Sequence, residues 1–292
     1  MRARIGRWVS AVLLTGATLV AMSGCAGADL VSGWPAMAEP TGWEPKAGVC
    51  TGNFGETSYR AGYVPIDCAE AHTYETVHVG TFIGDAAALA KPPAQGSTAL
   101  GGAWAECDAK TTEYLGAPWR DGKIWIAVSV PSAGSWEGGA RWFRCEAAAT
   151  DERFGLTTAW SGTLKGELAA ESELRFGCYL VPKDSGKKWD EVACTQQHNA
   201  EYVGTFISTT DYEDLPKDTA TIHRKCLSLV ASYVGVPDDG MMKYRAGTGY
   251  SVPSSGEWAA GDHGVRCHLY LGKMKTTSLK GAGGKGLPVN YA

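Results

Sequence analysis

Val130-Pro131-Ser132-Ala133-Gly134-Ser135-Trp136 is followed by Arg144-Cys145, and the same order returns as Val252-Pro253-Ser254-Ser255-Gly256-Glu257-Trp258 with Arg266-Cys267. Counted backwards from each copy, the two halves of the chain match element by element. The 292 residues are enough for two domains of about 120 residues each. The sequence therefore predicts two tandem homologous domains, at 46–166 and 167–281.

Each half contains one segment with the pattern of a helix that is buried on one side. Its larger side chains recur at four- and three-residue steps, and a glycine stands just past the end. Both copies place a tyrosine seven residues after a cysteine, on the same helical face, so the cysteine is expected to point inward. The residues are Leu100, Trp104, Cys107, Thr111, Tyr114 and Gly116, and then Ile222, Cys226, Leu229, Tyr233 and Gly235.

Strand-like segments surround each helix. Three precede it, the last ending in the shared sequence Gly-Thr-Phe-Ile, and two follow it, joined by the repeated Pro-Ser-x-Gly loop. This order predicts an α+β fold in which each repeat is a mostly antiparallel sheet covered by one helix. The strands expected after the helices are 123–130 and 140–147 in the first half, and 242–252 and 264–271 in the second.

The first 24 residues have the zones of an export signal: a basic start, an apolar run from Val9 to Met22, and small residues before Cys25. The run is shorter than the about 20 residues of a membrane-spanning helix. Ala21-Met22-Ser23-Gly24-Cys25 resembles the lipobox of bacterial lipoproteins, and ordinary secretion is the alternative. We expect a signal peptide at 1–24, membrane attachment through lipid on Cys25, a tether at 25–45 and a frayed tail at 282–292.

The charge balance argues against nucleic acid as a partner. The chain has 27 Lys and Arg against 31 Asp and Glu, and its first 24 residues contain three of the basic ones. Removal of the leader leaves 24 basic against 31 acidic residues, a net charge of −7. With no basic stripe in the sequence to neutralise phosphates, nucleic-acid binding is not expected.

Eight cysteines follow Cys25, four in each repeat, and an even number at repeated spacings in an exported protein indicates disulfides. Four cysteines in one repeat allow three pairings, among which the sequence does not choose. We favour pairs that flank a short hairpin, which leaves the other two cysteines to join the helix to the last strand. The pairs are Cys50 with Cys68, Cys107 with Cys145, Cys178 with Cys194, and Cys226 with Cys267.

His72 and His198 each lie four residues after a cysteine. A backbone hydrogen bond at a strand edge is the simplest role for them, and a ligand-binding or pH-sensing role is the alternative. The Cys-x-x-x-His spacing could be half of a zinc site, but no second such pair is near in sequence, and exported thiols tend to oxidise. We expect neither a metal nor a cofactor and keep both histidines as candidate binding residues.

Trp136 and Trp258 lie in matched Gly-rich loops. Exposed indoles there could stack on a sugar ring or anchor a partner. The alternative is that each tryptophan folds over the end of the sheet as a lid on the core. The two loops are the candidate binding edge because function concentrates in loops held by rigid scaffolds.

The sequence contains no Gly-x-Ser-x-Gly elbow, no His-Glu-x-x-His and no P-loop. Glu137 and Glu257 lie near the repeated tryptophans but are offset from each other, so they are not a matched carboxylate pair. No catalytic residues are assigned, and the protein is not expected to be an enzyme.

Several motifs resemble the septum-formation domain family of actinobacterial envelope proteins. They are Cys194-Thr-Gln-Gln-His198-Asn-Ala-Glu201, then Cys226, Tyr233-Val-Gly235, Pro253, Trp258, Gly261-Asp262 and Arg266-Cys267, with Cys68-Ala-Glu-Ala-His72 in the first repeat. The first repeat departs by having Gly138-Gly139 where the second has Gly-Asp. The resemblance implies an exported or membrane-anchored protein linked to septation.

The residues and the resemblance together predict a lipid-anchored, extracytoplasmic scaffolding or binding module without catalysis. Its partners would be envelope or division proteins, or cell-wall glycan. One alternative is a carrier that binds a glycan or peptide through the repeated loops. Another is a cell-wall enzyme with a site assembled across the repeats.

Overall fold

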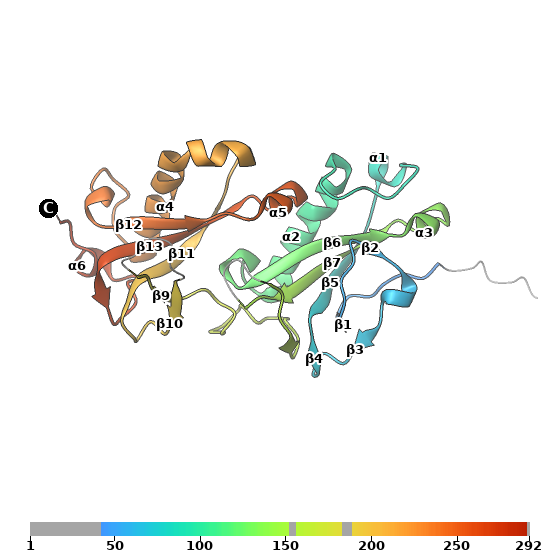
Figure 1. The fold of residues 1–292 in the computed structure, drawn as a ribbon, viewed down its shortest axis with the longest axis horizontal. Coiled ribbons are helices and arrows are strands. Elements are labelled where there is room, and N and C mark those ends of the chain that lie inside the picture. Colours follow the sequence, from blue (N-terminus) through green and yellow to red (C-terminus); the bar gives the residue numbers. More distant parts are fainter. Residues whose placement is uncertain (1–41, 152–155, 183–188, 291–292) are drawn as a thin grey trace, which may run out of the picture. The chain divides into compact units, whose positions relative to one another are not determined.

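The computed structural model describes residues 42–151, 156–182 and 189–290. The expected signal peptide, Cys25 and most of the tether lie outside the described residues. Residues 42–292 cluster as one compact unit, so the contacts do not divide the two repeats into separate domains. Figure 1 shows the helices and strands of this unit.

The first repeat forms a six-stranded sheet in the order β2-β6-β7-β5-β1-β3, antiparallel except where β2 pairs with β6. A separate two-stranded sheet joins β4 to β8. The strands are β1 (Val49–Thr51), β2 (Thr57–Ser58), β3 (Pro65–Ile66), β4 (Ala71–His72), β5 (Tyr74–Thr81), β6 (Ile124–Pro131), β7 (Trp142–Ala149) and β8 (Trp160–Ser161). The helices are α1 (Gly84–Ala87), α2 (Gly101–Leu115) and α3 (Ala133–Glu137), with 3-10 turns at Arg60–Gly62, Thr98–Leu100 and Trp119–Asp121.

The second repeat forms a five-stranded antiparallel sheet in the order β10-β9-β11-β13-β12. Its strands are β9 (Cys178–Leu180), β10 (Asp190–Val192), β11 (His198–Ile207), β12 (Gly247–Ser251) and β13 (Gly264–Lys275). Its helices are α4 (Thr219–Val234), α5 (Ser255–Ala260) and α6 (Gly283–Gly286), with 3-10 turns at Tyr212–Lys217 and Met242–Tyr244. The α+β class is therefore confirmed.

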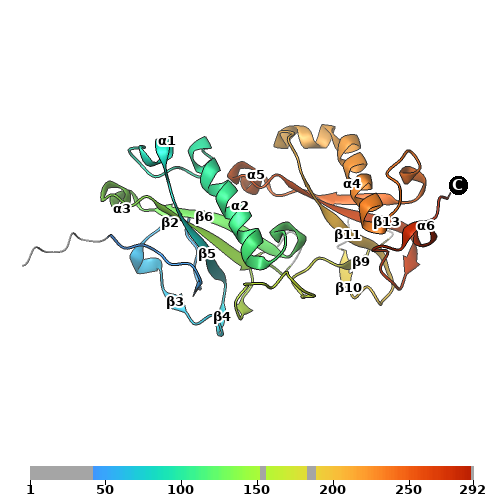
Figure 2. The ribbon, with the colours of Figure 1, turned by 180° about the vertical axis from the view of Figure 1, so that it is seen from behind.

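One long helix covers one face of each sheet, as the periodicity predicts. Figure 2 shows α2 across the sheet of β5, β6 and β7, and α4 across that of β11 and β13. The α2 face that packs on the sheet is made of Ala103, Trp104, Cys107, Thr111 and Leu115. Both helices end at the predicted glycine, Gly116 with φ 81° and Gly235 with φ 79°, a left-handed conformation that glycine adopts without steric cost.

Strand alternation divides β7 between two surfaces. Phe143, Cys145 and Ala147 belong to the core under the helix. Arg144 and Glu146, the residues between them, therefore face the other side of the sheet, and both are buried. β13 alternates in the same way, so Arg266 lies on the surface that no long helix covers.

The four disulfides join the cysteines in the pairs that we favour. Cys50 pairs with Cys68 and Cys178 with Cys194 across the short hairpins. Cys107 pairs with Cys145 and Cys226 with Cys267, which ties each long helix to the last strand of its sheet. In the chain-entropy model, each bridge stabilises the fold by about 3 to 4 kcal/mol.

Three sequence predictions were wrong in local detail. The Pro-Ser-x-Gly loops are short helices, α3 and α5, because Ser132 and Ser254 accept hydrogen bonds from the backbone three residues on. The expected strand 242–252 begins with a 3-10 turn and becomes a strand only at Gly247. Residues 282–290 contain α6 and are not frayed, since Leu287 is 2% exposed in the core.

Candidate functional site

His72 and His198 have a structural role, because each ring contacts the backbone of its own repeat. Both are buried, and each ring lies with Nδ1 at hydrogen-bond distance from a carbonyl two residues earlier, at 2.9 Å from Glu70 and 2.8 Å from Gln196. The predicted backbone hydrogen bond is confirmed. Neither ring is placed to meet a ligand from solvent.

A buried carboxylate three residues after the first histidine organises its repeat. Glu75 is 1% exposed. It accepts hydrogen bonds from the Tyr114 hydroxyl at 2.5 Å, the Thr163 hydroxyl at 2.6 Å and the Leu164 amide at 2.7 Å. Burial, together with the Glu75 carboxylate, raises the pKa of Tyr114 to about 12. Glu75 thereby fastens a strand, the helix and the returning chain to one another.

The second repeat has the same arrangement around Glu201. Its carboxylate accepts from the Tyr233 hydroxyl at 2.8 Å, the Ser278 hydroxyl at 2.8 Å and the Leu279 amide at 2.9 Å. Burial raises the pKa of Tyr233 here too. His198 adds a contact, with Nε2 at 3.2 Å from Glu201 Oε1. The sequence Leu-Lys-Gly occurs in both repeats, at 164–166 and 279–281, and at its leucine the chain returns to the buried carboxylate of that repeat.

Trp136 and Trp258 are core residues, 1% and 6% exposed. The Trp136 indole donates to the Leu89 carbonyl at 2.7 Å and packs edge-on to Phe82. Trp258 stacks on His263 with ring centroids 4.7 Å apart. The lid interpretation is confirmed, and both tryptophans are lost as surface stacking residues because the short helices α3 and α5 turn them inward.

A second buried carboxylate of the first repeat, Glu146, lies on the sheet face away from α2. It accepts a hydrogen bond from the Thr76 hydroxyl at 2.8 Å. The Arg144 Nε lies 3.3 Å from it but without hydrogen-bonding geometry among the described residues. Burial raises the pKa of Glu146 to about 7, outweighing the lowering by Arg144 and Thr76.

The two repeats are joined by Arg120, which lies in the 3-10 turn after α2. Its guanidinium contacts the Asp108 carboxylate at 2.5 Å through Nη1 and the Asp262 carboxylate at 2.7 Å through Nε. Arg266 Nε donates in turn to the Arg120 carbonyl at 3.3 Å. Asp262 is 4% exposed, so its charge is paired where water does not reach it.

Neighbouring contacts extend this joint. The Tyr202 hydroxyl donates to the Asp121 carboxylate at 2.7 Å, and the Phe176 amide donates to the Asp121 carbonyl at 3.1 Å. A Cβ at Gly264 would lie 2.5 Å from the Arg120 side chain, so a glycine is needed for this close approach. The 3-10 turn Trp119–Asp121 and the glycine after it therefore pack against the second repeat.

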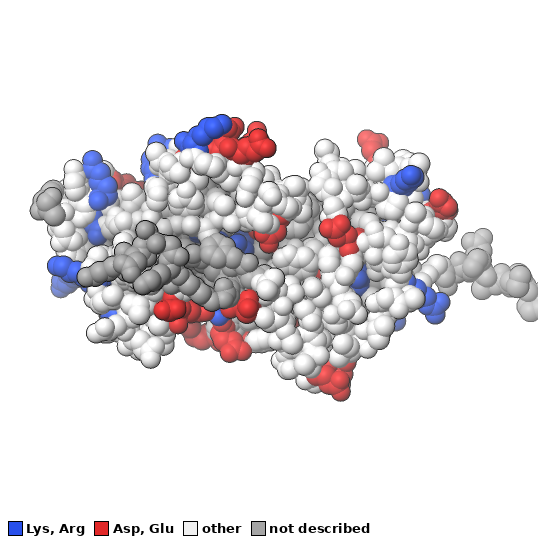
Figure 3. All heavy atoms as spheres, viewed as in Figure 1, with Lys and Arg blue, Asp and Glu red and all other residues white. Residues whose placement is uncertain are grey.

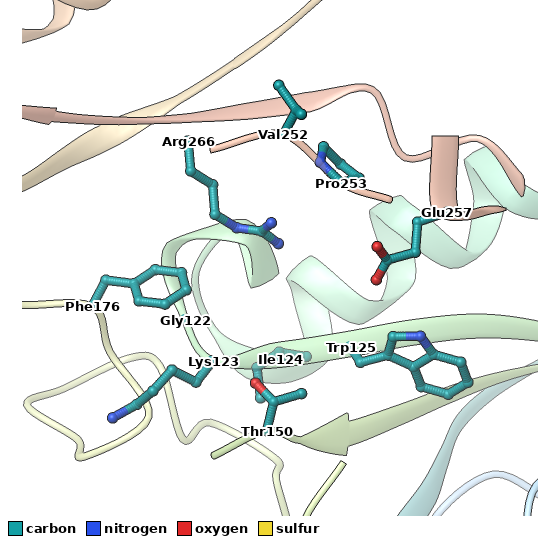
Figure 4. Close-up of a pocket in the computed structure, with 10 residues that line it drawn as sticks. All are labelled: Gly122, Lys123, Ile124, Trp125, Thr150, Phe176, Val252, Pro253, Glu257 and Arg266. Carbon is teal, nitrogen blue, oxygen red and sulfur yellow. The ribbon is translucent and has the colours of Figure 1, made fainter. Parts of the chain in front are cut away.

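A pocket opens beside the joint, between the two repeats. Figure 4 shows the Arg266 guanidinium and the Glu257 carboxylate reaching into it from the second repeat, above the start of β6. Its volume is about 60 Å³, room for a few water molecules or one small group. The lining residues are Gly122, Lys123, Ile124, Trp125, Thr150, Phe176, Val252, Pro253, Glu257 and Arg266.

The pocket offers one cation and one anion to a ligand. Lys123 is engaged elsewhere, with its ammonium 2.9 Å from Glu191. Arg266 uses Nε for the Arg120 carbonyl, which leaves its terminal N–H groups directed into the pocket. Glu257 accepts from the Ser254 amide and hydroxyl through Oε2. The arrangement suits a small group that carries both a carboxylate and a donor.

The cysteine and histidine clusters do not form a metal centre in the described part of the chain. Two groups have the spacing of metal ligands, Cys50, Cys68 and Glu75, and Cys178, His198 and Glu201. Each includes cysteine sulfur that is bound in a disulfide and so supplies no thiolate. Within the described residues, no helix has the length and apolarity required to cross a membrane.

Sequence reasoning missed the pocket, the contact between the repeats, and the matched buried glutamates Glu75 and Glu201. The glutamates had a usable signal, because each lies three residues after the matched histidine. The contact between the repeats has no such signal in a single sequence, because Arg120 and Asp262 are 142 positions apart. The pocket depends on that joint.

The fold and disulfides define a class: a disulfide-stapled α+β protein built from an internal repeat. A family model described as septum formation matches residues 47–267. The chain belongs to this septum-formation family, as the motifs predict. The matched range covers most of both repeats. No curated protein and no solved structure matches this chain.

Proposed function

We propose that this protein is a lipid-anchored, extracytoplasmic scaffold of the cell envelope that acts in septum formation without catalysing a reaction. The observation that carries the proposal is the septum-formation family match across residues 47–267. Two features of the molecule support a scaffold: four disulfides, and a buried ion pair that joins the two repeats. Lipid on Cys25 would keep this unit at the extracytoplasmic face of the membrane.

The first test is the position of the protein in dividing cells. A full-length fusion to a fluorescent protein that folds outside the cytoplasm is compared with the same fusion carrying Cys25→Ala. Enrichment at the septum that disappears with Cys25→Ala is the expected result. Uniform envelope staining of the unchanged fusion throughout the cell cycle would remove the link to septation.

Partner capture follows from the same fusion. A scaffold predicts crosslinks to division or envelope proteins, reduced when Arg120→Ala separates the repeats. Arg60→Ala, a change at an exposed position in the first repeat, is the matched control. Equal crosslinking by both variants would mean that the paired arrangement of the repeats is not what partners recognise.

A second candidate function is the binding of a peptide or glycan fragment through one small end group that enters the pocket between the repeats. Arg266 and Glu257 favour it, since together they match a carboxylate and an amino or hydroxyl group. Trp125 lines the same pocket and would report binding by fluorescence. Soluble wall fragments are expected to quench it, and Glu257→Gln to weaken the effect.

Two controls make that experiment specific. Trp125→Phe should abolish the fluorescence change if Trp125 is the reporter. Glu137→Gln, at the residue beside the first repeated tryptophan and away from the pocket, should leave the titration unchanged. Quenching that survives Trp125→Phe would place the ligand elsewhere. Measurable turnover of the fragments would support the enzyme alternative instead.

A further inference from the structure

The end of the second repeat has a charge balance opposite to that of the whole chain. The sequence contains 31 Asp and Glu, yet none after Asp262. In Figure 3, Lys and Arg atoms gather around the part of the second repeat that carries the C-terminus in Figure 1. The basic residues beyond Asp262 are Arg266, Lys273, Lys275, Lys280 and Lys285.

Part of this charge lines a groove of about 950 Å³. Its walls are the 3-10 turn Met242–Tyr244 and the residues after it, the end of β13, and the segment 286–290. The charged residues that line it are Lys243, Arg245, Lys273 and Lys275, and the described lining residues include no Asp or Glu. We name this surface the basic groove.

A bulge in β13 projects part of the groove into solvent. His198 of β11 pairs with Lys275, but Ala200 pairs with Tyr270, so residues 271–274 lie opposite Asn199 alone. The Asn199 amide bonds to both backbone groups of Val181, at 2.7 and 3.0 Å, on the side of β9. The extra residues of β13 therefore loop outward, the usual effect of a bulge on side-chain direction.

The rim of the basic groove combines cations with exposed apolar side chains. Met274, on the bulge, is 46% exposed, and Tyr244 is 42% exposed. Lys273 precedes Met274 and is also exposed, and the Lys243 ammonium lies 5.0 Å from the Tyr244 ring. Aromatic and apolar side chains among lysines are typical of protein surfaces that settle into the headgroup layer of a membrane.

We propose that the basic groove binds the headgroups of anionic phospholipids at a membrane surface, with Met274 and Tyr244 entering the interface. The cations would neutralise phosphates, and the bulge would reach below them. A soluble polyanion would use the cations but would gain nothing from an exposed methionine. The nearest acids along the chain, Asp238 and Asp239, precede the turn, and Asp239 accepts from the Met241 amide at 2.9 Å. The proposal holds whether or not Cys25 carries lipid.

The test is vesicle co-sedimentation of the full-length oxidised chain carrying Cys25→Ala, so that no acyl chain contributes. Vesicles of phosphatidylglycerol are compared with vesicles of phosphatidylcholine at low and at physiological salt. Each cation near an anionic surface changes partitioning about 5-fold, so Lys243→Gln with Lys273→Gln should weaken binding to phosphatidylglycerol about 30-fold. Both lysines are exposed, and their replacement should not disturb the fold.

A matched control separates the groove from net charge. Lys91→Gln with Lys165→Gln removes two exposed lysines from the first repeat and should change binding less than 2-fold. Met274→Ser should weaken binding while leaving its salt dependence unchanged, because it removes no charge.

Three results would overturn the proposal. The first is equal binding to the two kinds of vesicle, which would assign any association to the apolar leader present in every variant. The second is an equal loss in the two double-lysine variants, which would reduce the effect to net charge. The third is binding of soluble inorganic polyphosphate without binding to phosphatidylglycerol vesicles, which would make the groove a site for a soluble polyanion.

Discussion

Glu146→Gln is expected to stabilise the protein at pH 8 and to have little effect near pH 4. Glu146 is 1% exposed, and burial raises the pKa of its carboxyl to about 7 from an ordinary 4.5. Between these values the folded state holds a proton that the unfolded chain has lost. Stability from this group is therefore full below about pH 4.5 and is lost as the pH rises through 7.

The size of the effect follows from the shift. The pKa of Glu146 in the folded protein exceeds its ordinary value by about 2.5, and each pKa unit corresponds to about 1.4 kcal/mol. The ionised carboxylate therefore lowers the free energy of unfolding at pH 8 by about 3 kcal/mol. Glutamine is neutral and nearly isosteric, and its amide oxygen can still accept from the Thr76 hydroxyl. The variant should avoid the cost and keep the hydrogen bond.

The assay is urea unfolding followed by tryptophan fluorescence at pH 4.5, 6, 7 and 8, with the disulfides intact. The quantity of interest is the difference in unfolding free energy between the variant and the unchanged protein, since the titration of other groups cancels in it. Glu171→Gln, at an exposed position, is the control and should give a flat line near zero. A difference for Glu146→Gln that does not grow with pH would refute the reasoning. A less stable variant at pH 8 would mean that the attraction of Arg144 exceeds the cost of burial.

Three further predictions concern the framework. Replacing Cys107 and Cys145 by alanine removes a bridge across 38 residues and should lower the free energy of unfolding in urea by about 4 kcal/mol. Replacing Cys50 and Cys68, which are 18 residues apart, should lower it by about 3 kcal/mol. The reverse order would contradict the loop-entropy account. Arg120→Ala leaves the buried Asp262 carboxylate without its cationic partner and should cost about 3 to 5 kcal/mol, splitting one calorimetric transition into two. One sharp transition at an unchanged midpoint would show that the Arg120 contact does not couple the repeats. Ser254→Ala removes the capping box with Glu257 and should cost about 1 kcal/mol, with Ser255→Ala as the control on the same helix.

Features with a local sequence pattern could be predicted. The long helices follow from their periodicity and end at glycines that adopt a left-handed conformation, as expected of Gly116 and Gly235. The disulfide pairs follow from hairpin reach. The capping box of α5 could also be predicted, since Ser254 and Glu257 have the required spacing. The sequence predicts a loop there because a glycine lies between these two residues.

Features that depend on distant contacts could not be predicted in this way. Segment 282–290 looks frayed because of its glycines, yet Arg245 donates to the Leu287 carbonyl at 2.6 Å and Lys275 to that of Gly286 at 3.3 Å. The overall composition gives no sign of the basic groove, because the net charge is summed over the whole chain and does not show how charges are distributed on the surface. Single-sequence reasoning has no means of bringing such residues together.

The differences between the two repeats are more informative about function than their likeness. After the long helix, the first repeat reads Pro118-Trp-Arg-Asp-Gly122 and the second Pro237-Asp-Asp-Gly240, so the arginine that joins the repeats exists in one copy only. The position after the fourth cysteine is Glu146 in the first copy and His268 in the second, and the bulge of 271–274 belongs to the second copy alone among the described strands. Among the residues that the two copies share, several stabilise the fold. They are the cysteines, the buried Glu75 and Glu201, and the two tryptophans. The residues in which the copies differ are therefore the better candidates for recognition. Among them are Glu257 of the inter-repeat pocket, where the first copy has Ser135, and Lys273 of the basic groove, whereas Arg266 of the pocket has its match in Arg144.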